Sequence, residues 1–169
     1  MRRLRQNVDV PLSAVTHDIN QIKKEYSFYK GSAIVKALKK NFFDAYYVEN
    51  KSEAAKLLHQ LIPDNSVIGV GDSHSFYELD MESELKTRGC KLIPNVAALN
   101  LHSYNSDEYG YVKAPTREQA RDILADYLTS DVFVLSANAI TMEGEIINVD
   151  GVGNRIAGSL YGADRIIMV

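Results

Sequence analysis

The spacing of hydrophobic residues divides the chain into predicted helices and strands. Between Asp18 and Lys40, apolar residues recur at every third or fourth position with lysines between them, which predicts an amphipathic helix. The residues on this apolar face are Ile19, Ile22, Tyr26, Tyr29, Ala33 and Ala37. Further helices are predicted at 52–61, at 76–88, from the Thr116 capping box to about residue 128, and at 154–161.

Short runs of apolar and β-branched residues between these helices predict strands. They lie at 44–48, 66–70, 91–93, 131–135, 146–149 and 165–169. The runs at 66–70 and 131–135 lack alternating polar residues, which is typical of parallel strands covered on both faces. The alternation of strands and helices therefore predicts an α/β fold, with a mostly parallel sheet and helices on both faces.

We expect one domain that spans residues 1–169, with a flexible segment at 1–16. Residues 95–114 have no clear period and carry several tyrosines, which predicts a long surface loop able to cover a site. An interior strand normally leads into a helix that covers it. The apolar run that ends at Val169 therefore favours truncation of a longer native protein.

The composition argues against several classes of protein and several kinds of site. The net charge of -3 is spread along the 169 residues, which argues against a nucleic-acid surface. Cys90 is the only cysteine, so the chain can form no intrachain disulfide and offers no set of thiolates for zinc or an iron–sulfur cluster. Neither a secretory signal nor an apolar run of bilayer length is evident. We therefore expect a cytoplasmic protein with no membrane or nucleic-acid partner and no metal site.

The loop after the run at 66–70 is the first candidate binding site. Gly69 and Gly71 permit close backbone approach, and Ser73 and Ser75 lie at the start of a helix, where backbone N–H groups and hydroxyls can bind an anion. The alternative is that a serine only caps the helix and Gly71 only makes the turn. The third glycine of a dinucleotide fingerprint is missing and Phe76 lies at the start of the helix, so we predict no NAD site.

The loop after the run at 131–135 is the second candidate. It begins with the small residues of 136–141, among which Ser136 and Asn138 carry polar side chains. Asn138 can donate and accept hydrogen bonds to a ligand, or it can satisfy neighbouring peptide groups as a turn residue. The sequence leaves both roles open.

The segment 150–155 gives the best candidate anion site. It follows a strand and opens a helix, and it contains Asp150, Gly151, Gly153, Asn154 and Arg155. Arg155 can bind a phosphate or carboxylate through two hydrogen bonds, and Asp150 can orient it, hold a ligand hydroxyl or act as a base. The alternative is an Asp–Arg pair that only holds the loop in place.

Catalytic candidates are few. Asp150 and Glu143 are the candidate general bases or nucleophiles, although Glu143 precedes a glycine and fits a solvated turn. Asp72, Ser73 and His74 are adjacent in sequence, so their side chains point apart and do not make a triad. Asp72 and His74 alone are too few ligands for a metal ion.

Two long segments resemble the LUD (lactate-utilisation) family. The first runs from Ser136 to Ala157 and includes Asp150-Gly-Val-Gly-Asn-Arg155, and the second covers 161–167. Residues 37–54 and 61–67 also resemble single-domain members of the family, so the resemblance covers most of residues 20–169. The resemblance does not extend to residues 95–114. Asp72 stands where the family commonly has a glycine, and its carboxylate would repel an anion at the loop after the run at 66–70.

The resemblance implies a fold similar to the sugar-phosphate isomerase and coenzyme A transferase superfamily. It also implies a link to the oxidation of lactate to pyruvate, with iron–sulfur clusters held by partner subunits. We therefore expect an accessory or ligand-binding component that takes a small anionic metabolite, either a carboxylate or a phosphorylated compound. A stand-alone isomerase or acyl-transfer enzyme and a non-catalytic assembly module are the alternatives, and a homo-oligomer stays open.

Overall fold

The computed structural model describes residues 12–71, 73–93 and 116–169. The predictions for Asp72 and for the loop at 95–114 lie outside these residues, and the prediction for 1–16 lies largely outside them. The chain divides into two compact units. Unit 1 comprises Met1–Tyr47 with Thr141–Glu145, and unit 2 comprises Val48–Ile140 with Ile146–Val169.

Unit 1 is built on the helix α1, Leu12–Lys40, which confirms the helix predicted from Asp18 to Lys40. The rings of Phe28 and Tyr47 meet edge to face with centroids 5.6 Å apart. Gly31 allows this contact, because a Cβ at that position would lie 2.2 Å from the Tyr47 ring. The strand predicted at 44–48 is wrong, since these residues have no regular secondary structure and Tyr47 packs on α1 instead.

The turn expected at Glu143 from the glycine that follows it is present in unit 1. Thr141 accepts a backbone hydrogen bond from Gly144, and its own N–H donates to Glu145 at 2.9 Å. Asn41 Nδ2 donates to the carbonyl oxygens of Glu143 and Gly144 at 3.1 and 3.2 Å. Gly144 has a φ of +80° and lies against α1, where a Cβ would be 2.8 Å from the Ala37 carbonyl carbon. Both the conformation and the space require glycine there.

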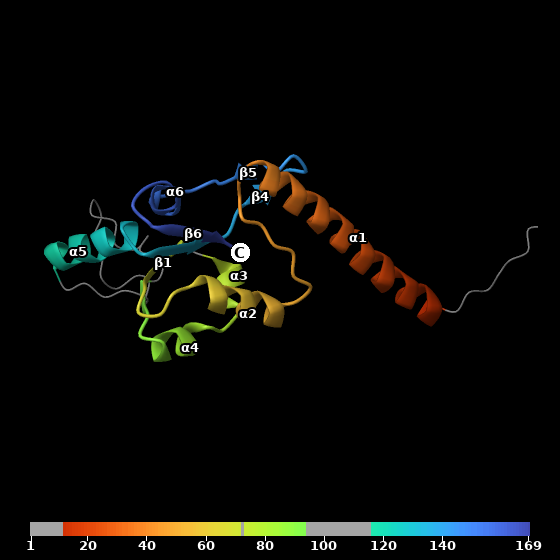
Figure 1. Cartoon of the computed structure of the whole chain (residues 1–169), viewed down its shortest axis with the longest axis horizontal. Helices are drawn as coiled ribbons and strands as arrows, with labels where there is room; N and C mark the ends of the chain where they lie inside the picture. Colours follow the sequence, from red (N-terminus) through yellow and green to blue (C-terminus); the bar gives the residue numbers. More distant parts are fainter. Residues whose placement is uncertain (1–11, 72, 94–115) are drawn as a thin grey trace, which may run out of the picture. The chain divides into compact units, whose positions relative to one another are not determined.

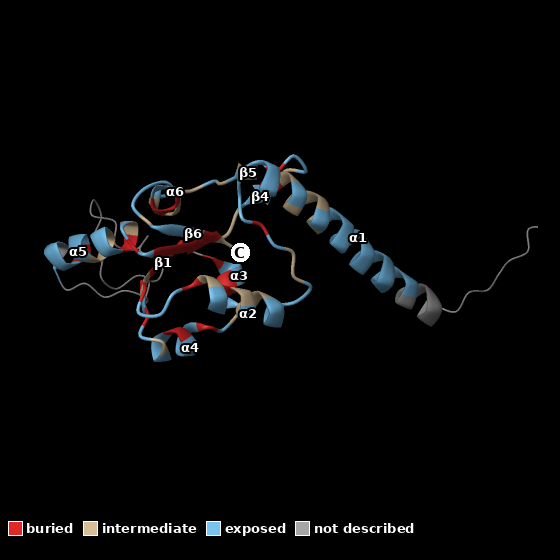
Figure 2. Cartoon of the chain, in the orientation of Figure 1, coloured by how far each residue is buried: buried red, intermediate tan, exposed pale blue. Residues whose placement is uncertain are grey.

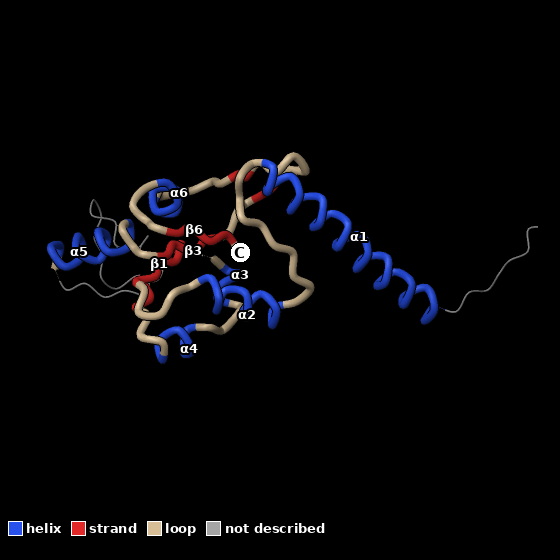
Figure 3. Tube along the Cα trace, in the orientation of Figure 1, coloured by secondary structure: helices blue, strands red, loops and turns tan. Residues whose placement is uncertain are grey.

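Unit 2 contains a four-stranded parallel sheet with the strand order β2-β1-β3-β6, which confirms the predicted α/β fold. Figure 3 shows β1, β3 and β6 in red, with helices in blue around them. Its strands are β1 (Val67–Gly71), β2 (Lys91–Ile93), β3 (Val132–Leu135) and β6 (Arg165–Met168). A separate antiparallel pair consists of β4 (Ala139–Ile140) and β5 (Ile146–Ile147). The fully apolar runs thus became β1 and β3, the two central strands.

Successive side chains of the strands enter two different cores. On β3, Val132 and Val134 pack with residues from the helices α2, α3 and α4, whereas Phe133 and Leu135 pack with residues from α5. Figure 1 shows helices on both faces of the sheet, and Figure 2 shows the strands among its most buried parts. These helices are α2 (Lys51–Leu61), α3 (His74–Tyr77), α4 (Glu82–Thr87), α5 (Arg117–Leu128) and α6 (Asn154–Leu160). Among the helices that the structure describes, none combines the length and apolar character needed to cross a bilayer.

The single helix predicted at 76–88 is wrong. The chain forms α3 and α4 instead, separated by Asp80 with a φ of +51°. Aspartate adopts this left-handed conformation more readily than most residues. The break allows Met81 to lie buried in the core beneath α2, where a continuous helix would have a different register.

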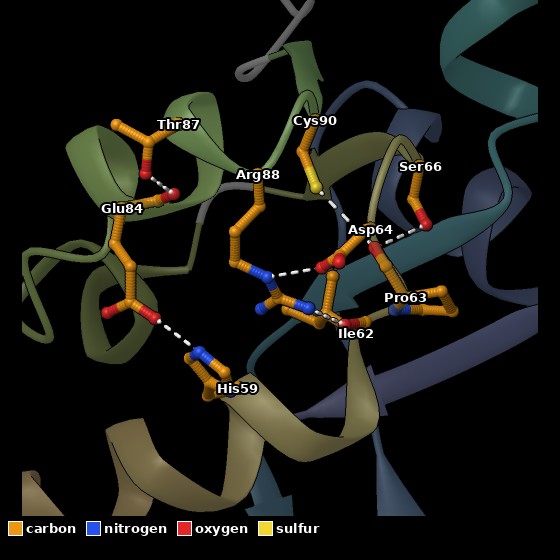
Figure 4. Close-up of polar contacts among 9 residues, drawn as sticks. All are labelled: His59, Ile62, Pro63, Asp64, Ser66, Glu84, Thr87, Arg88 and Cys90. Atoms are coloured by element: carbon orange, nitrogen blue, oxygen red, sulfur yellow. Dashed lines mark hydrogen bonds and ion pairs between the residues drawn. The ribbon is translucent and has the colours of Figure 1, made fainter.

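Arg88 fixes the start of the sheet (Figure 4). Its Nε donates to Asp64 Oδ1 and its Nη2 donates to the Ile62 carbonyl oxygen, both at 2.6 Å, from a side chain that is only 15% exposed. Cys90 is buried, and its thiol donates to the Pro63 carbonyl oxygen at 3.5 Å. These contacts hold the loop that enters β1 against the turn that enters β2, and they give Cys90 a structural role.

Candidate functional site

The strand order places a topological switch between β1 and β3. From β1 the chain crosses to β2 on one side, whereas from β3 it crosses to β6 on the other side. The loops that leave β1 and β3 therefore separate at the carboxyl ends of these strands, where Gly71 pairs with Leu135. In open α/β sheets, ligands bind in the crevice at such a point. We call the region formed by Gly71, 73, 136–138 and 150–155 the C-terminal edge.

A pair of serines joins the two loops at this edge. Ser73 Oγ lies 2.7 Å from Ser136 Oγ, and it also accepts a hydrogen bond from Phe76 N at 3.1 Å. Ser73 is fully buried and is the N-cap of α3, whereas Ser75 is exposed on that helix. The capping alternative therefore describes Ser73, and the same hydroxyl connects α3 to the end of β3.

The two glycines of β1 make room for protein side chains. A Cβ at Gly69 would lie 2.8 Å from the Phe133 ring and 2.9 Å from Ser130 Oγ. A Cβ at Gly71 would lie 2.9 Å from Phe133 and 3.2 Å from Arg155 Cγ. The close approach predicted for this loop is thus made by the Phe133 ring and by the aliphatic part of Arg155. Gly69 lies inside the core, and Gly71 supports the stem of the arginine.

Asn138 connects the second loop to the third. Its Oδ1 accepts hydrogen bonds from Val149 N at 2.8 Å and from Arg155 Nη1 at 3.3 Å. Its own N–H donates to the Ile147 carbonyl oxygen at 3.0 Å. Asn138 therefore satisfies neighbouring peptide groups, which is one of the two roles left open by the sequence, and its side chain also contacts the guanidinium group. Its contact with a ligand stays a prediction.

Asp150 anchors the start of α6. Its Oδ1 accepts from Val152 N at 3.1 Å and its Oδ2 accepts from Ile156 N at 3.0 Å. Partial burial alone would raise the pKa of this carboxyl, but hydrogen bonds from the backbone N–H groups of Ile156, Gly153, Val152 and Arg155 together lower it below its usual value. The loop 150–155 is consequently held by a carboxylate bound to backbone donors, next to a Gly153 with a φ of +91°.

We expect Asp150→Asn to lower the free energy of unfolding at pH 7 by about 1–2 kcal/mol, because the amide is a weaker acceptor than the carboxylate. The lowered pKa of Asp150 means that its stabilisation is fully present above the pKa of the unfolded chain and is lost as the pH falls through the lower folded value. Urea unfolding between pH 7 and pH 3 would measure this, with the difference between parent and variant shrinking in acid.

Asp122→Asn on the exposed surface of α5 removes the same charge without these hydrogen bonds and serves as the control. An Asp150→Asn variant as stable as this control at pH 7 would contradict the anchoring role.

Tyr127 supports the site from the core, a role that the sequence did not reveal beyond an apolar position on α5. Its hydroxyl accepts a hydrogen bond from Asn154 Nδ2 at 3.2 Å, and its ring meets Phe133 edge to face at 5.0 Å. Burial raises the pKa of Tyr127, so the phenol stays neutral. Asn154 thus connects the first turn of α6 to α5.

The remaining candidates lie apart from this cluster. Glu143 is exposed in the turn of unit 1, and His74 is exposed on α3. Within the described ranges, no three His, Cys, Asp or Glu side chains gather as a metal site would require. A hollow between α2 and α4 includes His59 and Glu84, whose side chains meet at 3.1 Å (Figure 4), on the sheet face opposite α5. It shares no residue with the C-terminal edge.

Comparison with known proteins gives one informative result. The family model described as LUD domain matches residues 32–169, which include every strand of the sheet and all of the C-terminal edge. No curated protein and no solved structure matches the chain. The similarity to the sugar-phosphate isomerase and coenzyme A transferase superfamily therefore stays a prediction.

Proposed function

Since the chain belongs to the LUD domain family, we propose that it is a component of lactate utilisation that binds a small carboxylate at the C-terminal edge. The family match covers residues 32–169 and makes the chain a lactate-utilisation-related domain protein. The ligand and its binding residues are proposed from the geometry of the C-terminal edge. They follow from the contacts of Arg155, Asn138 and the serine pair.

The proposal rests on the contacts that hold the Arg155 side chain in place. Its stem lies against Gly71 at the end of β1, and its guanidinium group is oriented by Asn138 from the loop after β3. Both anchors belong to the switch point of the sheet, where ligands of this class of fold bind. A guanidinium presents its N–H donors in a planar fork that matches the two oxygens of a carboxylate.

The neighbouring groups favour a monoanion. The Asp150 carboxylate is already bound by backbone N–H groups, so those groups offset part of its repulsion of a second anion. Ser136, half-buried beside Ser73, supplies a hydroxyl suited to the 2-hydroxyl or keto oxygen of lactate or pyruvate. In the sequence, Asp72 adjoins the same edge, and its charge would oppose the dianion of a phosphate more than a carboxylate.

The proposal assigns binding to this chain and electron transfer to other subunits. Oxidation of lactate to pyruvate releases two electrons and two protons. Iron–sulfur clusters would accept the electrons one at a time, and the protons would pass to a base and to solvent. The sequence contains one cysteine, and Cys90 is buried and donates to Pro63, so these residues do not fit a cluster. We therefore propose that partner subunits carry the clusters and that this chain presents or senses the organic acid.

Calorimetric titration of the full chain with lactate, pyruvate, glucose 6-phosphate and coenzyme A would test the proposal. We expect lactate or pyruvate to bind, and we expect Arg155→Ala to weaken that binding at least tenfold, because a charge-assisted hydrogen-bond pair is lost. Arg155→Lys keeps the charge but loses the planar fork of N–H donors, so its affinity should lie between those of the parent and Arg155→Ala.

Arg121→Ala on the exposed surface of α5 is the matched control and should bind like the parent. Equal affinity in parent and Arg155→Ala, or no binding of either organic acid, would overturn the proposal. Turnover of a substrate from the same panel that is lost in Asp150→Asn would favour the stand-alone enzyme instead.

A further inference from the structure

The first half of α1 carries an apolar stripe with the spacing of a coiled coil. Ile19, Ile22, Tyr26 and Tyr29 follow one another at intervals of three, four and three residues, and the sequence continues the same spacing back to Val15 and Leu12. This 3.5-residue repeat places the apolar residues at positions a and d of successive heptads. The four side chains are 42%, 62%, 60% and 70% exposed. Figure 2 shows most of α1 as exposed.

The stripe is not the face that α1 uses within unit 1. Phe28 and Gly31 lie against Tyr47, and Leu38 is buried near Gly144. In the heptad these three residues occupy positions c and f, on the opposite side of the helix from a and d. The helix therefore has two apolar faces, and the contacts of unit 1 cover only one of them.

We propose that α1 forms a parallel coiled coil with further copies of this chain. The charged residues beside the stripe indicate that the partner is a second copy of the same helix. Asp18 and Glu25 occupy the g positions, whereas Lys23 and Lys30 occupy the e positions. Lys30 Nζ lies 5.3 Å from the centre of the Tyr26 ring, which places this lysine at the border of the stripe.

These charges complement one another only between parallel copies. In a parallel coiled coil, a g residue of one helix faces the e residue five positions further along the next. Asp18 would then face Lys23 of the second copy, and Glu25 would face Lys30. In an antiparallel pair, g faces g and e faces e, so acidic residues would meet acidic residues and lysines would meet lysines.

The position of the stripe in the chain fits this role. Residues 12–31 precede the LUD domain match, which begins at residue 32. An isolated helix of this length is marginal in water unless an apolar face is buried. Ile19 at a and Ile22 at d are compatible with three strands as well as two. The inference is independent of the ligand proposed for the C-terminal edge.

Sedimentation equilibrium of the full chain at micromolar concentrations would test the self-association. We expect a mass of two or three chains for the parent and of one chain for Ile22→Asp. Asn20→Asp introduces the same residue and the same charge two positions away, outside the stripe, and should keep the parent mass. A monomeric parent would overturn the proposal, as would an unchanged mass for Ile22→Asp or a monomeric Asn20→Asp.

Charge exchange tests the parallel arrangement without changing the stripe, and cross-linking tests it through a single substitution within the stripe. Glu25→Lys should weaken association about tenfold, and adding Lys30→Glu should restore it. Under a mild oxidant, Tyr29→Cys should form a disulfide between copies, because equal positions meet only in a parallel pair, whereas Asn20→Cys should not. Cys90 is buried and should not contribute. Failure of the double variant to recover, or equal cross-linking of both cysteine variants, would overturn the parallel coiled coil.

Discussion

Replacement of Phe133 by alanine is expected to lower the free energy of unfolding by about 4 kcal/mol. The ring is fully buried on β3, and it packs against the backbone at Gly69, Gly71 and Gly158 and against the ring of Tyr127. Three of these four neighbours have no side chain that could move into the space, so the cavity would stay open. Urea unfolding followed by far-UV circular dichroism measures the loss.

Two variants separate this effect from a general weakening of the strand. Val134→Ala truncates the next residue of β3, which is equally buried but faces the opposite core. We expect it to cost about 2 kcal/mol, since fewer atoms are removed. Phe133→Leu should cost less than Phe133→Ala. A Phe133→Ala variant no less stable than Val134→Ala would contradict the role assigned to the glycine-lined space.

Gly158→Ala is expected to destabilise the protein by about 2–3 kcal/mol. Gly158 lies inside α6, where alanine would ordinarily stabilise a helix by about 1 kcal/mol relative to glycine. The new methyl group would lie 2.2 Å from two atoms of the Phe133 ring, however, so either the helix or the ring must move. The steric cost therefore exceeds the gain in helix propensity, so the alanine lowers the free energy of unfolding instead of raising it.

Thermal and urea unfolding of Gly158→Ala beside Gly151→Ala would measure this reversal. A Cβ at Gly151 meets no atom within 4 Å, so that variant should stay within about 0.5 kcal/mol of the parent. In a Phe133→Leu background, the cost of Gly158→Ala should fall by more than 1 kcal/mol, because the smaller side chain leaves room. Stabilisation by Gly158→Ala in the parent would show that α6 does not lie against this ring.

The sequence predicted those elements whose environment is uniform along their length. The runs at 66–70 and 131–135 became β1 and β3 because central strands of a parallel sheet are buried on both faces. The helix predicted at 76–88 failed at Asp80, where the chain turns without the usual glycine or proline signal. The run at 44–48 has strand-forming residues, but its aromatic side chain at Tyr47 packs on α1. Propensity alone did not separate that contact from a strand.

At the candidate site, the sequence identified residues but not their contacts. Asn138 and Arg155 were placed on two loops, and the structure joins them through one hydrogen bond. The capping alternative for Ser73 could be read from its place before a helix, whereas its contact with Ser136 depends on the pairing of β1 with β3. Tyr127 was indistinguishable from other apolar positions of α5. Its bond to Asn154 arises only when α5 and α6 lie on the same face of the sheet.

The central position of β3 also determines which backbone amides are protected from hydrogen exchange. Its backbone pairs with β1 on one side and with β6 on the other, so its amide hydrogens are released only when one of these pairings separates. The loops of the C-terminal edge begin where this pairing stops, at Leu135 and Gly71. Slow hydrogen exchange along β3 should therefore give way to faster exchange at residues 136–137, before the hydrogen-bonded N–H of Asn138. The side chains that would contact a ligand can then adjust while the sheet beneath them stays closed.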